Sequence, residues 1–114
     1  MLENNQDASS EILIVAYPDS RLTTAASDVV DFNDEDYLSV VDKLIRKMAQ
    51  ADHCVGLAAN QIGSNLNVFV ANAAKNKRET SEYGFVVVVN PKIVNPRGTI
   101  QRREGCMSVP DLTV

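Results

Sequence analysis

The sequence predicts an α+β fold in which short antiparallel or mixed β-strands pack around one long helix near the N-terminus. Three observations support this class. One segment has the apolar spacing of an amphipathic helix, several short runs favour strands, and tight turns join most of these runs. The chain shows no regular βαβ alternation, which argues against a doubly wound parallel sheet. Its 114 residues, 45% hydrophobic and 23% charged, suit a single globular domain.

The helix is expected at about residues 34–50, with Asn33 as its N-cap. Acidic residues occupy positions 34–36, where the positive end of the helix dipole favours carboxylates. Apolar residues recur at helical spacing and form one stripe: Leu38, Val41, Leu44, Ile45 and Met48. The start signals and the apolar face agree on one amphipathic helix.

Five short strands are expected, at residues 12–15, 67–71, 85–89, 92–94 and 99–102. Proline-containing turns at 17–20 and 95–98 separate some of them, and Asn90 with Pro91 ends another. The apolar run at 85–89 is continuous, as is typical of a strand buried on both faces. Residues 73–83 are expected to be a charged connector.

Residues 1–10 are polar and are expected to form a disordered tail before a single domain at 11–114. The tail lacks the basic start and apolar core of a secretory signal. No run approaches the roughly 18 apolar residues that a membrane span needs. The net charge of −4 disfavours direct nucleic-acid binding, and two cysteines do not suggest a disulfide framework. The expected location is the reducing cytoplasm.

One segment with chemical character is residues 56–61, where small residues precede Gln61. Small residues allow a ligand or another backbone to approach closely. A positioned amide N–H such as that of Gln61 can stabilise a developing oxyanion. The alternative is a tight turn whose small residues pack against the sheet while Gln61 bonds a backbone group. The residue types alone leave both interpretations open.

The second such segment is the turn around Cys106. A thiolate is a good ligand for iron or zinc, whereas a lone cysteine is often simply a small buried hydrophobe. A nucleophilic cysteine would want a histidine, and the only one is His53, which as a C-cap or solvated residue is a poor candidate. A catalytic metal takes about three protein ligands, and nothing places His53 or Cys54 near Cys106.

In their order and surroundings the two segments resemble two of the three signature motifs of the peptide deformylases. Residues 54–61 resemble the Gly-x-Gly-hydrophobic-Ala-Ala-x-Gln motif, with Cys54 in place of its first glycine, and residues 104–108 resemble Glu-Gly-Cys-hydrophobic-Ser. The turn at 17–22 and the Asn-Pro strand end at 89–91 are also similar to the family. The third motif, a His-Glu-x-x-His helix at the centre of the family core, has no counterpart before Val114.

The resemblance implies specific roles at the metal. Cys106 would be the thiolate ligand, and Gln61 would bind the developing oxyanion together with the backbone N–H of Met107. The metal would be Fe(II), with zinc or nickel as substitutes, and it would activate the water that attacks the formyl carbon. The replacement of glycine by Cys54 puts in doubt any positive φ or close approach needed there.

The resemblance also implies a substrate groove, in which the backbones of Val55 and Gly56 would contact the formyl peptide. Glu104 and Gly105 would hold the cysteine turn in shape. The partners would be formyl-methionyl nascent peptides, as they emerge at the ribosome.

Two histidine ligands, the general-base glutamate and a central helix have no counterpart. A truncated deformylase domain, inactive alone, is therefore expected. The alternatives are a non-catalytic module that binds peptides or a partner subunit, and a cysteine-dependent hydrolase, which the lack of a suitable histidine disfavours.

Overall fold

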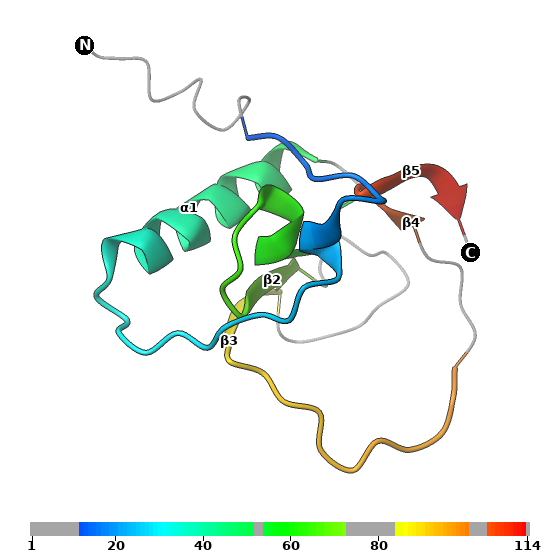
Figure 1. The fold of residues 1–114 in the computed structure, drawn as a ribbon. Helices are drawn as coiled ribbons and strands as arrows, with labels where there is room; N and C mark the ends of the chain where they lie inside the picture. The colour runs from blue at the N-terminus through cyan, green and yellow to red at the C-terminus, as the bar shows by residue number, and fades with distance from the viewer. Residues whose placement is uncertain (1–11, 52–53, 73–83, 101–104, 114) are drawn as a thin grey trace.

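The structure is a computed structural model that describes residues 12–51, 54–72, 84–100 and 105–113 (Figure 1). A three-stranded antiparallel sheet has the order β1 (Gly56–Ala58), β2 (Val68–Asn72) and β3 (Phe85–Val89), and β4 (Gly105–Cys106) pairs with β5 (Val109–Thr113) as a separate antiparallel hairpin. The remaining elements are the helix α1 (Glu35–Gln50) and two 3-10 turns, η2 (Ser20–Leu22) and η3 (Ala59–Ile62). Antiparallel strands packed around one long helix confirm the predicted α+β class.

The predicted helix is confirmed, but its predicted cap is wrong. The N-cap is Asp34, whose carboxylate accepts a hydrogen bond from the Tyr37 N–H at 3.4 Å. Asn33 lies one residue too early, in a turn where its own N–H donates to the carboxylate of Asp31. Both residue types are good caps, so the sequence alone did not decide between neighbours.

The core lies between α1 and one face of the sheet. Val40, Leu44 and Met48 are the buried residues of α1, and they pack in one cluster with Leu57 of β1 and Val70 of β2. The predicted apolar stripe is therefore only partly right, since the buried set includes a residue that the stripe omitted. Two members of the stripe that lie away from the sheet, Leu38 and Ile45, are 51% and 39% exposed.

Strand β3 forms where predicted, but it is not buried on both faces. It pairs with β2 alone, so it is an edge strand within the described part of the chain. Val87 lies opposite the fully buried Val70 in the register and therefore faces the same side as α1. Because α1 packs over β1 and β2, Val87 is left at the margin and is 37% exposed, with Phe85 at 44%.

The Asn-Pro end of β3 is confirmed, and Asn90 also holds a distant loop. Its φ of +54° turns the chain out of the strand. Its side-chain amide accepts a hydrogen bond from the Val29 N–H at 2.7 Å and donates one to the Val29 carbonyl at 3.0 Å. The Asn90 amide thus pairs with the Val29 backbone as a neighbouring strand would, and buries Val29 against the core.

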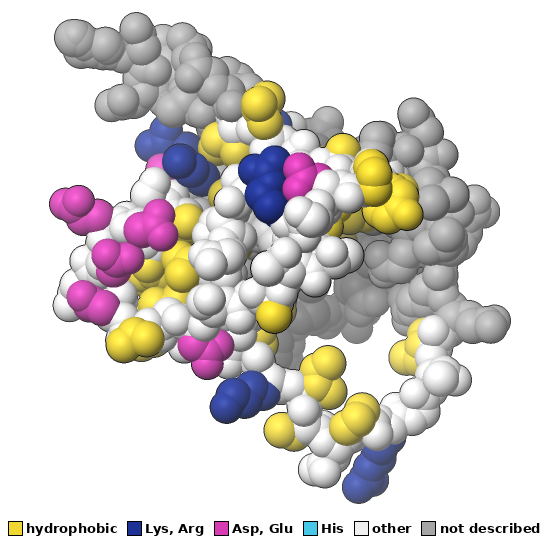
Figure 2. All heavy atoms as spheres, viewed as in Figure 1, with side chains coloured by type: hydrophobic (Ala, Val, Ile, Leu, Met, Phe, Trp, Pro, Cys, Tyr) yellow, Lys and Arg dark blue, Asp and Glu magenta, His cyan; other side chains and the backbone are white. Residues whose placement is uncertain are grey.

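Residues 91–100 form no strand, so the strand predicted at 92–94 is wrong. The strand predicted at 99–102 is wrong for its first two residues, and its remainder lies outside the described residues. This segment follows β3 as an open arc that stands off the rest of the described structure (Figures 1 and 2). Its apolar side chains Ile93, Val94 and Ile100 are 76–87% exposed, since nothing in the described structure packs on them.

The segment 12–15, predicted as a strand, is extended but belongs to no sheet. The Val15 N–H makes one backbone hydrogen bond to η3, and the N–H of Tyr17, just after this segment, makes one to the β4–β5 turn, so no continuous ladder forms. Three strands were not predicted at all: β1, whose small residues gave no strand signal, β4, which was expected as part of the cysteine turn, and β5, which contains Pro110. The expected tail at 1–10 and the charged connector at 73–83 lie outside the described residues.

Gly63 is expected to tolerate substitution poorly, because it ends η3 with a φ of +88°. A Cβ there would also lie 3.0 Å from Nη1 of Arg21. Gly63→Ala is expected to destabilise the fold by about 1–2 kcal/mol, the ordinary cost of a left-handed non-glycine residue. Urea unfolding followed by circular dichroism measures it.

The matched control is Gly56→Ala. A Cβ at Gly56 would meet its nearest neighbour, the Val70 carbonyl oxygen, at an unstrained 3.8 Å. In Gly56→Ala the free energy of unfolding should change by no more than about 0.5–1 kcal/mol, the usual glycine-to-alanine difference. Equal losses in the two variants would show that the left-handed turn is not what makes Gly63 necessary.

Candidate active site

Gln61 is held at the end of β1 by the tight turn η3. Its side-chain oxygen Oε1 accepts a hydrogen bond from the Ala58 N–H at 3.1 Å. A backbone N–H can only donate, so the amide oxygen must face Ala58 and the amide nitrogen must face the other way. The Gln61 side chain therefore bonds a backbone group and presents an oriented N–H donor as well, which combines the two interpretations left open by the sequence.

That donor points at the cysteine turn. Gln61 Nε2 lies 3.4 Å from the Cys106 sulfur and 3.3 Å from Ser108 Oγ. Cys106 is exposed, whereas Ser108 is only 2% exposed and is the one buried polar residue found in the described core. The fold thus brings together two side chains that are 45 residues apart in the sequence.

Cys106 lies directly before a two-residue turn. Cys106 pairs with Val109 across the hairpin, and Met107 and Ser108 form the turn between them. The Met107 side chain packs against the core cluster and anchors the turn to the body. The predicted cysteine turn is therefore shifted by one residue, because Cys106 itself closes β4 and the turn follows it.

The two residues predicted to line a substrate groove lie at the sheet edge formed by β1. Gly56 pairs with Ala71 of β2, and the Val55 carbonyl accepts a hydrogen bond from the Asn72 N–H at 2.8 Å. The opposite edge of β1 has no strand partner within the described residues. Val55 is 41% exposed, so this edge is accessible.

Of the other predicted residues, Gly105 lies in β4 opposite Thr113. Glu104 and the disfavoured candidate His53 lie outside the described residues. Cys54 is described: it is buried at 7%, and its thiol donates to the Gly56 carbonyl at 3.3 Å. Its φ is not positive, so the cysteine in place of the motif glycine fits its backbone without strain.

The donors in the described structure do not make up a metal centre. No group of three or more His, Cys, Asp or Glu side chains lies close enough together there to hold an ion. Cys106 offers one exposed sulfur, whereas a catalytic site takes about three protein ligands. The described residues therefore supply one metal ligand of such a site, Cys106, and not the full set.

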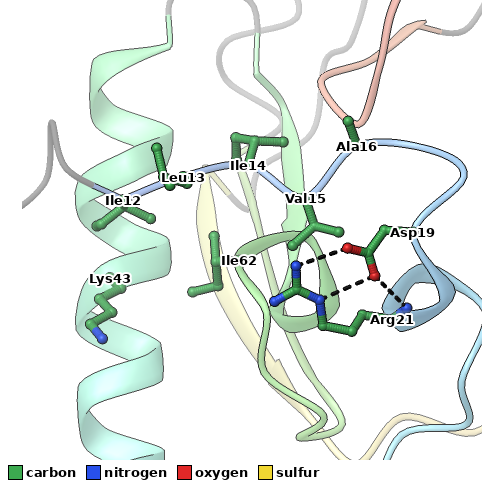
Figure 3. Close-up of a pocket in the computed structure, with 9 residues that line it drawn as sticks. All are labelled: Ile12, Leu13, Ile14, Val15, Ala16, Asp19, Arg21, Lys43 and Ile62. Atoms are coloured by element: carbon green, nitrogen blue, oxygen red, sulfur yellow. Dashed lines mark hydrogen bonds and ion pairs between the residues drawn. The ribbon is translucent and has the colours of Figure 1, made fainter.

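Ser108 is a functional candidate that residue-by-residue reasoning from the sequence missed. It is nearly fully buried, and its hydroxyl accepts the second hydrogen bond of the Gln61 amide. Serine is usually exposed, and only its place two residues after the cysteine could have singled it out. An open groove of about 660 Å³ lies elsewhere, between segment 12–16 and α1 (Figure 3), and no predicted site residue lines it.

An ion pair between Asp19 and Arg21 stabilises the turn η2. Arg21 donates to the two carboxylate oxygens of Asp19 from Nε at 3.1 Å and Nη2 at 2.9 Å, and its backbone N–H donates to Asp19 Oδ1 at 2.9 Å (Figure 3). The side-chain hydrogen bonds from Arg21, followed by the one from its backbone N–H, lower the pKa of Asp19 to about 2.

The Asp19 carboxyl group is expected to titrate with a midpoint near pH 2, followed by carbon-detected NMR. A carboxyl whose folded pKa is lowered contributes stability above its unfolded pKa of about 3.9, and that contribution disappears as pH falls through the folded value. The window is therefore about pH 4 down to pH 2. In Arg21→Ala the midpoint should return towards 3.9; an unchanged midpoint would assign the shift to another group.

Comparisons with known proteins agree with this geometry. A sequence model described as polypeptide deformylase matches residues 12–114. The peptide deformylase of Syntrophobacter fumaroxidans is 38% identical over 98 residues, which cover 86% of this chain and 55% of that protein. The peptide deformylase of Helicobacter pylori is 31% identical over 97 residues, with 85% and 54% covered. The chain thus spans about half the length of these curated relatives.

Solved structures give the same result. The crystal structure of peptide deformylase from Ehrlichia chaffeensis matches with a TM-score of 0.74 at 29% identity, and covers 90% of this chain and 60% of that one. A peptide deformylase from Legionella pneumophila matches with a TM-score of 0.72 at 38% identity, covering 89% and 57%. In the described part of the chain, no helix combines the length and hydropathy of a membrane span. With the family model matched over nearly all of its residues, the chain belongs to the polypeptide deformylase family.

Proposed function

We propose that this chain carries one part of the active centre of a peptide deformylase, which hydrolyses the N-formyl group from the formyl-methionine of nascent polypeptides. Residues 11–114 would be the truncated domain, acting in the cytoplasm. The observation that carries the proposal is the 3.4 Å contact between Gln61 Nε2 and the Cys106 sulfur. An oriented amide donor beside an exposed thiol suits a site where an anion develops next to a bound cation.

The roles of the chain's own residues follow from this contact. Cys106 would supply one thiolate ligand to Fe(II), or to zinc or nickel in its place, and that metal would provide the Lewis acidity of the reaction. The Gln61 amide would donate to the oxygen of the formyl carbon as it becomes negative. In a two-residue turn the N–H of the first turn residue takes no part in the strand ladder, so the Met107 N–H is a second donor.

The open edge of β1 would bind the peptide. An extended peptide can add to such an edge through backbone hydrogen bonds, and Val55 and Gly56 lie at the start of this edge, at the opposite end of β1 from η3. Glu104 and Gly105 would hold the cysteine turn. The described residues supply one metal ligand, so the chain by itself is proposed to bind no stoichiometric metal and to be inactive.

A second candidate is a non-catalytic module that binds peptides or a partner subunit. The unpaired β1 edge favours it, because this edge needs no metal to bind an extended peptide. The coding sequence after Val114 separates the two functions. An in-frame His-Glu-x-x-His would support the enzyme, and a stop codon would support the binding module.

The direct test uses the purified chain, with metal analysis and turnover of a formyl-methionyl peptide. The expected result is less than stoichiometric iron, zinc or nickel and no release of formate. Deformylation by this chain, lost in Cys106→Ala, would overturn the proposed inactivity while supporting the proposed chemistry. Binding of the formyl peptide without turnover even when the segment beyond Val114 is included would favour the module.

A further inference from the structure

We infer that segment 15–22, called the strap below, positions the Gln61 amide against Cys106 by binding η3 and the β4–β5 turn at the same time. This inference rests on the proposed function for its catalytic meaning, but its geometry stands independently. The strap begins at Val15, the last residue of the strand predicted at 12–15, and ends with the turn η2.

The first observation is a pair of backbone hydrogen bonds from alternate residues. The Val15 N–H donates to the carbonyl of Gln61 at 2.7 Å, and the Tyr17 N–H donates to the carbonyl of Ser108 at 2.8 Å. An extended backbone presents its N–H groups alternately, so residues two apart point the same way. One short segment therefore binds the residue that carries the amide and the turn that carries the thiol.

The second observation is that the strap also lies against the residues on both sides of Gln61, Asn60 and Gly63. The Asn60 side chain donates from Nδ2 to the carbonyl of Leu22 at 3.2 Å. On the other side, Arg21 Nη1 and Val15 Cγ2 lie 3.0 and 4.0 Å from where a Cβ of Gly63 would be. Asn60 and Gln61 of η3 thus bond to the strap, and Gly63, which ends the turn, lies next to it.

The third observation is what fixes the strap itself. Asp19 holds the Arg21 guanidinium with two side-chain hydrogen bonds and accepts a third from the Arg21 backbone. Figure 3 shows this pair at the end of the strap, with Val15 directed to the same side as Arg21. A planar guanidinium paired with a carboxylate in this way has a set orientation, so it holds the strap over Gly63.

The consequence concerns precision at the site. The contact from Gln61 to the sulfur is a 3.4 Å hydrogen bond between two separate elements. η3 and the hairpin share no strand ladder in the described structure, whereas the strap binds both. Small displacements of a donor cost much of its effect on a reacting group. Asp19 and Arg21 are therefore positioning residues: they act on Gln61 through the strap and do not contact the reacting atoms.

The test is NMR of the ¹⁵N-labelled chain, which needs neither metal nor turnover. In the unaltered chain, the amide hydrogens of Val15 and Tyr17 should exchange with solvent at least about tenfold more slowly than that of Ala16. Ala16 lies between them and donates no backbone hydrogen bond within the described residues. Exchange of all three at the same rate would overturn the inference without any substitution.

Arg21→Ala should then speed exchange at Val15 and Tyr17 by about tenfold or more and shift the side-chain NH2 signals of Gln61. Amides of α1 and β2 should keep their protection. The matched control is Arg46→Ala, which removes another exposed arginine–carboxylate pair, to Asp42 at 3.0 Å, on the outer part of α1. This control should leave the Gln61 signals unchanged.

Two further variants keep the inference testable if Arg21→Ala unfolds the chain. Arg21→Lys keeps the charge without the planar fork, and Asp19→Asn keeps an oxygen for the Arg21 backbone N–H without the carboxylate charge. Both should shift the Gln61 NH2 signals in the same direction, by less than the alanine variant. Unmoved Gln61 signals in a folded variant would refute the strap and leave the proposed deformylase intact; a module without catalysis could still have the strap.

Discussion

Leu44→Ala is expected to destabilise the domain by about 2–5 kcal/mol, the usual cost of removing a buried leucine side chain. Leu44 is completely buried, at the centre of the cluster that joins α1 to β1 and β2. A domain of 114 residues has a total stability of about 6–17 kcal/mol, so this one change removes a large fraction of it. Urea unfolding measured by far-ultraviolet circular dichroism gives the difference in unfolding free energy.

The control is Leu38→Ala on the same helix. Leu38 is 51% exposed, and alanine is at least as good a helix former, so the free energy of unfolding should change by less than about 1 kcal/mol. The sequence placed both leucines in one apolar stripe and did not distinguish between them. Similar losses on measurement would mean that Leu38 is covered in solution by residues outside the described structure.

The helix could be predicted because its signals are local. Acidic residues at its start and apolar residues at helical spacing are both determined within a few residues of each other. Which apolar residues are buried is decided by distant elements. Val40 is 5% exposed because it belongs to the cluster with β1 and β2, and no local pattern shows where those strands lie.

The strands show the same limit more strongly. The apolar composition of β3 correctly predicted a strand. The burial of β3 depends on whether another element covers it, and α1 packs over β1 and β2 instead. Residues 12–15 are strand-forming as well, yet the Val15 N–H bonds to the turn η3, and the N–H of Tyr17, two residues later, bonds to the hairpin. Local preference makes this backbone extended; only the positions of η3 and Ser108 decide what it bonds.

The candidate site was predictable in its chemistry and not in its geometry. The types of Gln61 and Cys106 suggested a donor and a ligand, and their motifs suggested the family. The direction of the amide follows from the Ala58 N–H, and the second acceptor, Ser108, is evident only when the two segments meet. Contacts between segments 45 residues apart are set by the whole fold, so a single sequence could not supply them.

Gln61→Ala is expected to lower the kcat for deformylation by about 100- to 1,000-fold, with a much smaller change in KM, because an oxyanion donor acts mainly in the transition state. The measurement applies where the coding sequence continues in frame into a His-Glu-x-x-His segment, and it uses that longer protein with formyl-methionyl peptide as substrate. Gln61→Glu should lose at least as much. Its carboxylate keeps an oxygen for the Ala58 N–H but places a second acceptor where Nε2 now donates to the sulfur.

The control is Asn67→Ala, which removes a different amide. Asn67 Nδ2 donates to Asp28 at 3.0 Å on the exposed surface, and within the described residues this side chain makes no hydrogen bond to η3 or the hairpin, so kcat should stay within about threefold of the parent. A rise in KM alone for Gln61→Ala would reassign the amide to ground-state peptide binding.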